Sequence, residues 1–176
     1  MSSGEPPPGV LYFERHFNDA FMDAIDALRT EIPVSLASGN MRANRRFLRD
    51  ATLAKNICER LPSEANVLSV CSDIRFIEYD EPGGYIQPHV DGTRVCEHTG
   101  LQTTHSMLVW LSDVPEDEGG ETDFLRDVTD EDSVLYSIRP KKGSVVIFRH
   151  DSPHVGRCVG VYPKLLLRGD VTCAEE

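Results

Sequence analysis

His89 and Asp91, two residues apart, are the first side chains in this sequence whose types and spacing suit chemistry. Alternate side chains of a strand point to the same face, so an H-x-D pair aims an imidazole and a carboxylate at one point. A third ligand is available downstream, His154 in Ser152-Pro153-His154. Two histidines and one carboxylate form the facial triad that holds non-haem Fe(II) and leaves positions open. H-x-D by itself is more often an ordinary surface pair than a metal site, so the assignment depends on the rest of the chain.

The other histidines have competing interpretations. His150 and His154 form H-x-x-x-H, which on a helix can hold zinc. Pro153 opposes a helix there, and the glutamate of the metalloprotease motif is missing, so we expect His150 to be a surface residue or a support for the ligands. His98 and His105 flank a polar loop, residues 92–103, that is either a substrate lid or a plain solvent loop.

Cations stand out at two places. In the expected strand 163–172, Lys164, Leu166 and Arg168 share one face, and Leu165 and Leu167 share the other. A cation that points inward needs an anion, because burying an unpaired charge is costly, and a dicarboxylate co-substrate would supply one. Residues 41–49 carry four arginines, including Arg42 and Arg49. This basic segment either grips a phosphate or carboxylate or, as we favour, forms a solvated basic face.

The elements that must position these residues fall into two regions. Asn18 or Asp19 can cap a helix that runs to about residue 30, and Asp50 can cap a second over residues 51–61. From about residue 67 onward, short apolar or alternating runs separated by Gly, Pro and Asp replace helical periodicity. The candidate strands are 73–79, 84–91, 104–111, 121–125, 133–138, 144–149 and 163–172. Many short strands predict an antiparallel sandwich or barrel, with the two helices packed outside one sheet.

Length and composition indicate one domain. The 176 residues divide into an expected disordered tail, 1–9, and a domain over 10–176, with a helical flank at about 17–62 and a β core at about 67–172. The net charge of −11 makes a nucleic-acid partner unfavourable. No apolar run reaches the roughly 18 residues of a membrane span. Five cysteines without C-x-x-C spacing and a start unlike a signal peptide predict reduced thiols and a cytoplasmic or nuclear protein.

The ordered motifs over residues 67–172 resemble a known family. Gly83-Gly84 follows Tyr79, and then come H-x-D, Gly119-Gly120-Glu121-Thr122-Asp123-Phe124, Pro140-Lys141-Lys142-Gly143, His154 and, ten residues later, Lys164. This set resembles the prolyl 4-hydroxylase-like group of the 2-oxoglutarate and Fe(II)-dependent dioxygenases. The resemblance implies a mainly β fold with flanking helices, namely the double-stranded β-helix, a cupin-like jelly roll.

The resemblance also implies roles for particular residues. His89, Asp91 and His154 correspond to the iron ligands, and Lys164 to the partner of the distal carboxylate of 2-oxoglutarate. Tyr79 corresponds to a hydroxyl donor to that carboxylate, and Arg168 is the second candidate cation. The implied cofactors are Fe(II), 2-oxoglutarate as co-substrate and O2, with ascorbate as a further reductant. One departure is Tyr85, which lies four residues before His89, whereas the family's aromatic lies three before.

The activity implied by the resemblance is hydroxylation of a C–H bond with release of succinate and CO2. The first candidate substrate is a peptidyl, prolyl-type one, and the second is a free amino acid or another small molecule. Asp91 occupies the position that related halogenating enzymes give to a small residue, so hydroxylation or demethylation is expected. A second class of function is a jelly-roll binding module without catalysis. The complete set of ligands and the co-substrate cation favour the enzyme.

Overall fold

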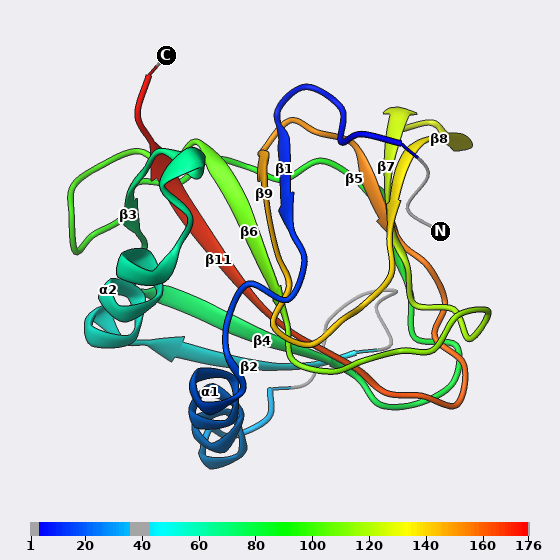
Figure 1. The fold of residues 1–176 in the computed structure, drawn as a ribbon, viewed down its shortest axis with the longest axis horizontal. Helices are drawn as coiled ribbons and strands as arrows, with labels where there is room; N and C mark the ends of the chain where they lie inside the picture. The colour runs from blue at the N-terminus through cyan, green and yellow to red at the C-terminus, as the bar shows by residue number, and fades with distance from the viewer. Residues whose placement is uncertain (1–3, 36–42, 176) are drawn as a thin grey trace.

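The computed structural model describes residues 4–35 and 43–175, which form two antiparallel sheets that face each other, with helices on one outer side (Figure 1). The larger sheet has seven strands in the order β1-β9-β6-β11-β4-β2, with β3 paired to β11. Its strands are β1 (Val10–Phe13), β2 (Asn44–Arg49), β3 (Val67–Val70), β4 (Asp73–Tyr79), β6 (His105–Trp110), β9 (Val145–Arg149) and β11 (Lys164–Cys173). The smaller sheet has the order β5-β10-β7-β8. Its strands are β5 (Ile86–His89), β7 (Thr122–Asp127), β8 (Asp130–Ile138) and β10 (His154–Gly156).

Two capped α-helices precede the main run of strands, as expected. Helix α1 (Asp19–Glu31) begins where the Asn18 side chain accepts a hydrogen bond from the Phe21 N–H, at 2.9 Å. Helix α2 (Ala51–Arg60) begins where Asp50 accepts from the Leu53 N–H, also at 2.9 Å. Each cap satisfies one of the N–H groups that a helix start leaves without a partner. A short 3-10 turn, η1 (Ser63–Ala65), connects α2 to β3.

The helices pack on the outer face of the larger sheet, which confirms their expected position (Figure 1). Met22 and Ile25 of α1 and Ile57 of α2 are fully or almost fully buried there. They belong to one apolar cluster with side chains from the central strands, among them Phe76 of β4 and Leu167 of β11. Burial of such large apolar side chains is the main stabilising contribution of this layer.

A second core fills the space between the two sheets. Strand alternation assigns Leu166 of β11 to this inner core and Leu167 to the outer core. Trp110, Phe124 and Phe148 are also buried in the inner core. The predicted face of Lys164, Leu166 and Arg168 is therefore the face between the sheets, where a site can be enclosed.

The structure differs from the expected elements chiefly at β2. Residues 44–49, within the expected helical flank 17–62, form an edge strand of the larger sheet. Its sequence, NRRFLR, lacks apolar alternation because its outward Arg46 pairs with Glu78 at 2.9 Å rather than entering an apolar core. Arg42 of the basic segment lies outside the described residues. Strands β1, β3 and β10, of three or four residues each, were also not expected, since such short runs carry little periodicity.

The end of the expected tail, residues 1–9, is hydrogen-bonded to β9 of the larger sheet. Residues 1–3 lie outside the described ranges, while the Gly9 carbonyl already accepts a hydrogen bond from Arg149 N–H at 3.0 Å and leads into β1. All five cysteines are free, as expected. Within the described ranges, no helix is long and apolar enough to cross a membrane. The cytoplasmic or nuclear location stays a prediction.

Candidate active site

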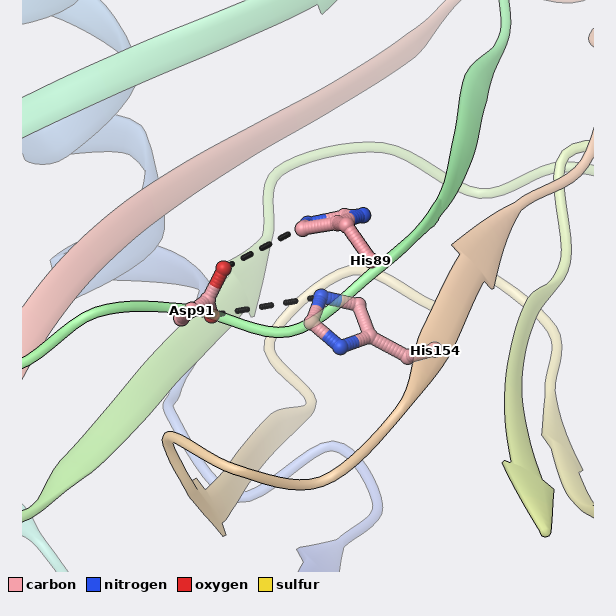
Figure 2. Close-up of side chains that lie close together, drawn as sticks. All are labelled: His89, Asp91 and His154. Atoms are coloured by element: carbon pink, nitrogen blue, oxygen red, sulfur yellow. Dashed lines mark ion pairs between the residues drawn. The ribbon is translucent and has the colours of Figure 1, made fainter. Parts of the chain in front are cut away.

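Three predicted metal ligands converge where β5 ends and β10 begins in the smaller sheet (Figure 2). His89 ends β5, Asp91 follows two residues later, and His154 begins β10. His154 and His89 are direct partners in the antiparallel pairing of the two strands. His89 Nε2 lies 3.3 Å from Asp91 Oδ1, and His154 Nε2 lies 3.9 Å from Asp91 Oδ2. The ligand atoms all lie within 4.8 Å of one another, close enough to share one ion.

The backbone sets the tautomer of both histidines. His89 Nδ1 lies 2.8 Å from the Gln87 carbonyl oxygen, and His154 Nδ1 lies 2.9 Å from the Ser152 carbonyl oxygen. A carbonyl only accepts hydrogen bonds, so each Nδ1 carries the proton and donates it. The lone pair is then on Nε2, the atom that faces Asp91 in both rings. This is the arrangement that orients an imidazole for metal binding.

The charges at the site also suit a cation. Burial lowers the pKa of His154 to about 4, helped by the neighbouring His89, so its ring is neutral at neutral pH. Burial alone would raise the pKa of Asp91. The positive charge of Arg168 and the hydrogen bond from Ser106 oppose this, and the pKa of Asp91 lies below its usual range. Neutral imidazoles and an ionised carboxylate are the protonation states that metal ligands require. The donor set therefore fits an Fe(II) ion.

A buried chain of hydrogen bonds supports Asp91. Ser106 Oγ donates to Asp91 Oδ2 at 2.6 Å and lies 2.9 Å from His150 Nδ1. A hydroxyl has one proton, so His150 Nδ1 must donate to Ser106. His150 Nε2 then accepts from the Thr103 hydroxyl, 2.9 Å away. Burial lowers the pKa of His150, which is consistent with this neutral ring.

This chain of hydrogen bonds defines the role of His150. His150 is a support for the ligands, one of its two expected roles. The H-x-x-x-H zinc pair is not formed, because both ring nitrogens of His150 are engaged by Ser106 and Thr103. Ser106 and Thr103 were not identified, since an isolated serine or threonine in a strand carries no spacing signal.

Lys164 and Tyr79 lie opposite each other on β11 and β4, facing the inner core. Lys164 Nζ lies 5.1 Å from the centre of the Tyr79 ring and 3.5 Å from Thr122 Oγ1. Burial lowers the pKa of Lys164 to about 8, although the charges of Glu121 and Asp123 partly oppose this. Among the described residues, no carboxylate lies within ion-pair distance of the ammonium. A buried cation of this kind is stabilised by an incoming anion.

Arg168 contacts a different part of the site from Lys164. Its NH2 group lies 3.4 Å from Asp91 Oδ2 and 3.4 Å from Asp170 Oδ1. Arg168 therefore lies beside the metal ligands, whereas Lys164 lies beside Tyr79, four residues away along β11. Arg168 thus faces the Asp91 carboxylate, and Lys164 faces the Tyr79 ring.

Two further predictions concern residues around the site. Tyr85 donates a hydrogen bond to Glu131 Oε2 at 3.2 Å and lines a cavity of about 1340 Å³ with several other carboxylates. Val95 and Gln102 bridge the two sides of the loop 92–103, and Arg94 N–H donates to Thr103 Oγ1 at 3.1 Å. A substrate lid and a plain solvent loop both stay predictions for this segment.

Comparison with known proteins places this fold and site in context. No curated protein sequence matches the chain significantly. Among solved structures, a prolyl-4-hydroxylase of Pseudomonas putida is similar with a TM-score of 0.68 at 15% identity, over 95% of this chain and 94% of that one. A viral collagen prolyl hydroxylase of Paramecium Bursaria Chlorella virus-1, in complex with 2-oxoglutarate, gives a TM-score of 0.65 at 19% identity, over 94% and 97% of the two chains. HygX of Streptomyces hygroscopicus, with nickel, 2-oxoglutarate and hygromycin B bound, has a TM-score of 0.67 at 11% identity, over 94% of this chain and 83% of that one.

These likenesses establish the fold as the double-stranded β-helix jelly roll of 2-oxoglutarate oxygenases. The family model of the 2OG-Fe(II) oxygenase superfamily matches residues 74–169, more than half of the chain. The chain therefore belongs to the 2OG-Fe(II) oxygenase superfamily, whose enzymes use Fe(II) and 2-oxoglutarate. His89, Asp91 and His154 form its candidate facial triad.

Proposed function

We propose that this enzyme binds Fe(II) through His89, Asp91 and His154 and hydroxylates a C–H bond of a peptidyl, prolyl-type substrate. The single observation that carries the metal assignment is the matched tautomer of the two histidines. Both present Nε2 to the same carboxylate. Local backbone carbonyls fix this arrangement, so the site is organised for an ion.

Lys164 and Tyr79 are proposed to hold the distal carboxylate of 2-oxoglutarate. Among the residues that the structure describes, no carboxylate pairs with the buried Lys164 ammonium, and the Tyr79 ring lies directly across the strand pair. Charge-assisted hydrogen bonds from an ammonium and a phenol satisfy one carboxylate. Arg168 is proposed to orient the Asp91 carboxylate rather than to hold the co-substrate, because it contacts Asp91 directly.

When bound, Fe(II) supplies the oxidation in which O2 gives one oxygen atom to succinate, as 2-oxoglutarate loses CO2, and the other to the hydroxyl group of the product. This chain's own residues bind and orient the participants. Ser106 and Arg168 hold Asp91 in its ionised form, while the buried Phe124 and Phe148 contact the His154 ring and keep water away from that side.

The prolyl-type substrate is supported by similarity in fold to bacterial and viral prolyl hydroxylases. A small-molecule substrate is the second candidate, favoured by a comparable similarity to the hygromycin B complex of HygX. The net charge of −11 argues against a nucleic acid. A non-catalytic binding module is disfavoured because the three metal ligands and the cation for 2-oxoglutarate are all present.

The test is turnover of 2-oxoglutarate to succinate by the purified protein with Fe(II) and ascorbate. We expect measurable uncoupled turnover in the wild type and none in His154→Ala. Lys164→Ala should raise the Michaelis constant for 2-oxoglutarate at least about tenfold, equivalent to about 1.4 kcal/mol. Arg168→Ala should raise it less, because that side chain contacts Asp91.

The pair of cation variants makes this test specific. A large defect for 2-oxoglutarate in the Arg168 variant beside a near-normal Lys164 variant would reverse the assignment. Wild-type turnover in His154→Ala would refute the proposed iron site. Mass spectrometry of peptide and metabolite pools for products heavier by one oxygen atom then identifies the substrate.

A further inference from the structure

A row of three side chains crosses the inner face of the larger sheet beside the metal ligands. Phe47 of β2 and Arg168 of β11 both pair directly with Arg75 of β4. Directly opposed residues in antiparallel strands project to the same face. Arg168 in turn contacts Asp91. Arg75 therefore lies one strand further from the candidate iron ligands than Arg168, at about 4.8 Å per strand.

Two arginines near Arg75, namely Arg168 and Arg94, have carboxylate partners. Arg168 pairs with Asp91 and Asp170, both at 3.4 Å. Arg94 pairs with Asp73 at 3.5 Å and with Asp170 at 3.7 Å. The local aspartates are thus shared among arginines that already engage them.

Arg75 differs from Arg168 and Arg94 in its side-chain contacts. Within the described residues its guanidinium makes no hydrogen bond and no ion pair. It is partly buried, and burial together with the charge of Arg168 lowers its pKa to about 10, only partly opposed by Asp170. A partly buried guanidinium among other arginines gains strongly from an anion that enters from outside.

Space for such an anion exists next to Arg75. A cavity of about 360 Å³ is lined by Phe47, Leu48, Arg49, Asp73, Ile74, Arg75 and Arg94. This volume lies at the small end of ligand sites in proteins. Phe47 is 55% exposed, which leaves apolar side-chain surface open beside the guanidinium. A carboxylate on Arg75 and an apolar group on Phe47 are the complementary ligand features.

We propose that the substrate of this enzyme carries a carboxylate that Arg75 binds, with Arg94 beside it, and that this contact orients the oxidised carbon toward the metal. This inference rests on the proposed function and specifies its substrate class. The carboxylate belongs either to a small free acid or to an acidic side chain close to the target residue of a peptide. A guanidinium binds both by the same pair of parallel hydrogen bonds.

The test compares acids with their uncharged amides on protein loaded with Ni(II) and saturating 2-oxoglutarate. The first arm uses proline and other apolar amino acids against their amides. The second arm uses short proline peptides with a neighbouring Asp against the same peptides with Asn. Binding is measured by calorimetry on the wild type, Arg75→Gln, Arg75→Lys and the control Arg49→Gln. Arg49 lines the same cavity but is exposed and paired with Asp73 at 2.7 Å.

We expect at least one acid to bind tenfold or more tightly than its amide to the wild type and to Arg49→Gln. Arg75→Gln should abolish this preference, and Arg75→Lys should restore part of it. The arm in which the preference occurs identifies the source of the carboxylate. Equal binding of every acid and amide, or an unchanged preference in Arg75→Gln, overturns the proposal.

A second readout separates this proposal from the proposed function. With Fe(II), Arg75→Gln should keep wild-type uncoupled turnover of 2-oxoglutarate while the Michaelis constant for the acid rises at least tenfold. If the wild type itself shows no uncoupled turnover of 2-oxoglutarate, the oxygenase activity is refuted instead.

Discussion

Each ligand histidine is oriented by the carbonyl two residues before it. His89 donates to Gln87 and His154 to Ser152, so the segment of chain just before each ring also fixes its tautomer. Asp91 is held differently, by Ser106 of β6 and Arg168 of β11. The two imidazoles are thus positioned locally, whereas the carboxylate depends on the opposite sheet. Mutation of the larger sheet is therefore expected to affect Asp91 first.

The pKa of Lys164 predicts how 2-oxoglutarate binding depends on pH. Its pKa is lowered to about 8 in the protein without co-substrate, and an ionised 2-oxoglutarate carboxylate pairs with the protonated ammonium. Binding above pH 8 therefore takes up a proton. We expect the affinity for 2-oxoglutarate to be constant below pH 7 and to fall above pH 8, approaching about tenfold per pH unit. Calorimetry on the Ni(II)-loaded protein between pH 6.5 and 9.5 measures this.

Lys164→Met is the control for that titration. It should bind 2-oxoglutarate weakly at every pH and lose the decline above pH 8. An affinity that is flat up to pH 9.5 in the wild type would exclude Lys164 as the anchor.

The effect of Lys164 on protein stability depends on pH in the opposite direction. Between the folded pKa and the usual pKa of lysine, 10.5, the unfolded chain holds a proton that the folded chain has released. The contribution of Lys164 to the free energy of unfolding therefore increases as pH rises through this window.

At the scale of elements, two short strands hold the histidines together. β5 and β10 pair through His89 and His154, and the pairing shifts register before Gly156 meets Ile86. A Cβ atom on Gly156 would lie 2.4 Å from Ile86 Cγ2, well inside contact distance. The glycine therefore allows the close approach of the strands that places both imidazoles on one ion.

Gly156→Ala is expected to push β5 and β10 apart and to weaken metal binding by about tenfold or more, a typical effect of misplaced ligands. Metal affinity is measured with Ni(II) by calorimetry. The double variant Gly156→Ala/Ile86→Ala removes the clashing methyl group and should recover most of the affinity. Ile86→Ala alone is the matched control. Unchanged affinity in Gly156→Ala would show that the strand contact does not set the ligand geometry.

At the scale of the whole molecule, the fold separates its stabilising core from its site. The outer core joins the helices to the larger sheet, and the site lies on the inner face between the sheets. Changes at the ligands should therefore leave the outer core, and with it the fold, largely intact. This separation makes the stabilising effect of a bound ion measurable.

Metal binding is expected to raise the melting temperature. An ion at about 100 times its dissociation constant stabilises the folded state by about 2.7 kcal/mol. For a chain of this length, each kcal/mol shifts the melting temperature by about 2–4 °C, which gives a rise of about 5–10 °C with Ni(II). Differential scanning fluorimetry with and without EDTA measures the rise.

The control is the same measurement on His154→Ala. Its own melting temperature should be lower, because the ring packs against Phe124 and Phe148. The readout is the shift on adding metal, which should disappear. An equal shift in the variant would place the stabilising ion elsewhere on the protein.

The sequence by itself determined the features that depend on neighbouring residues. Asn18 and Asp50 identify both helix starts, because a cap is a contact within three residues. Alternation assigns Lys164 and Arg168 to one face of β11, because the side-chain period of a strand is two. H-x-D and the distant His154 identify the candidate ligands through residue type and motif order. Each of these signals is local or follows a known pattern.

Only the tertiary structure decided which residues face one another across strands. The pairing of Lys164 with Tyr79, of Arg168 with Asp91, and of Arg75 with Phe47 depends on register, and a shift by one residue would turn every side chain to the other face. Register is set by the sum of contacts between segments far apart in the sequence. For the same reason β2 was not recognised as a strand. Its arginines gain their partners, such as Glu78 for Arg46, only once the sheet has formed.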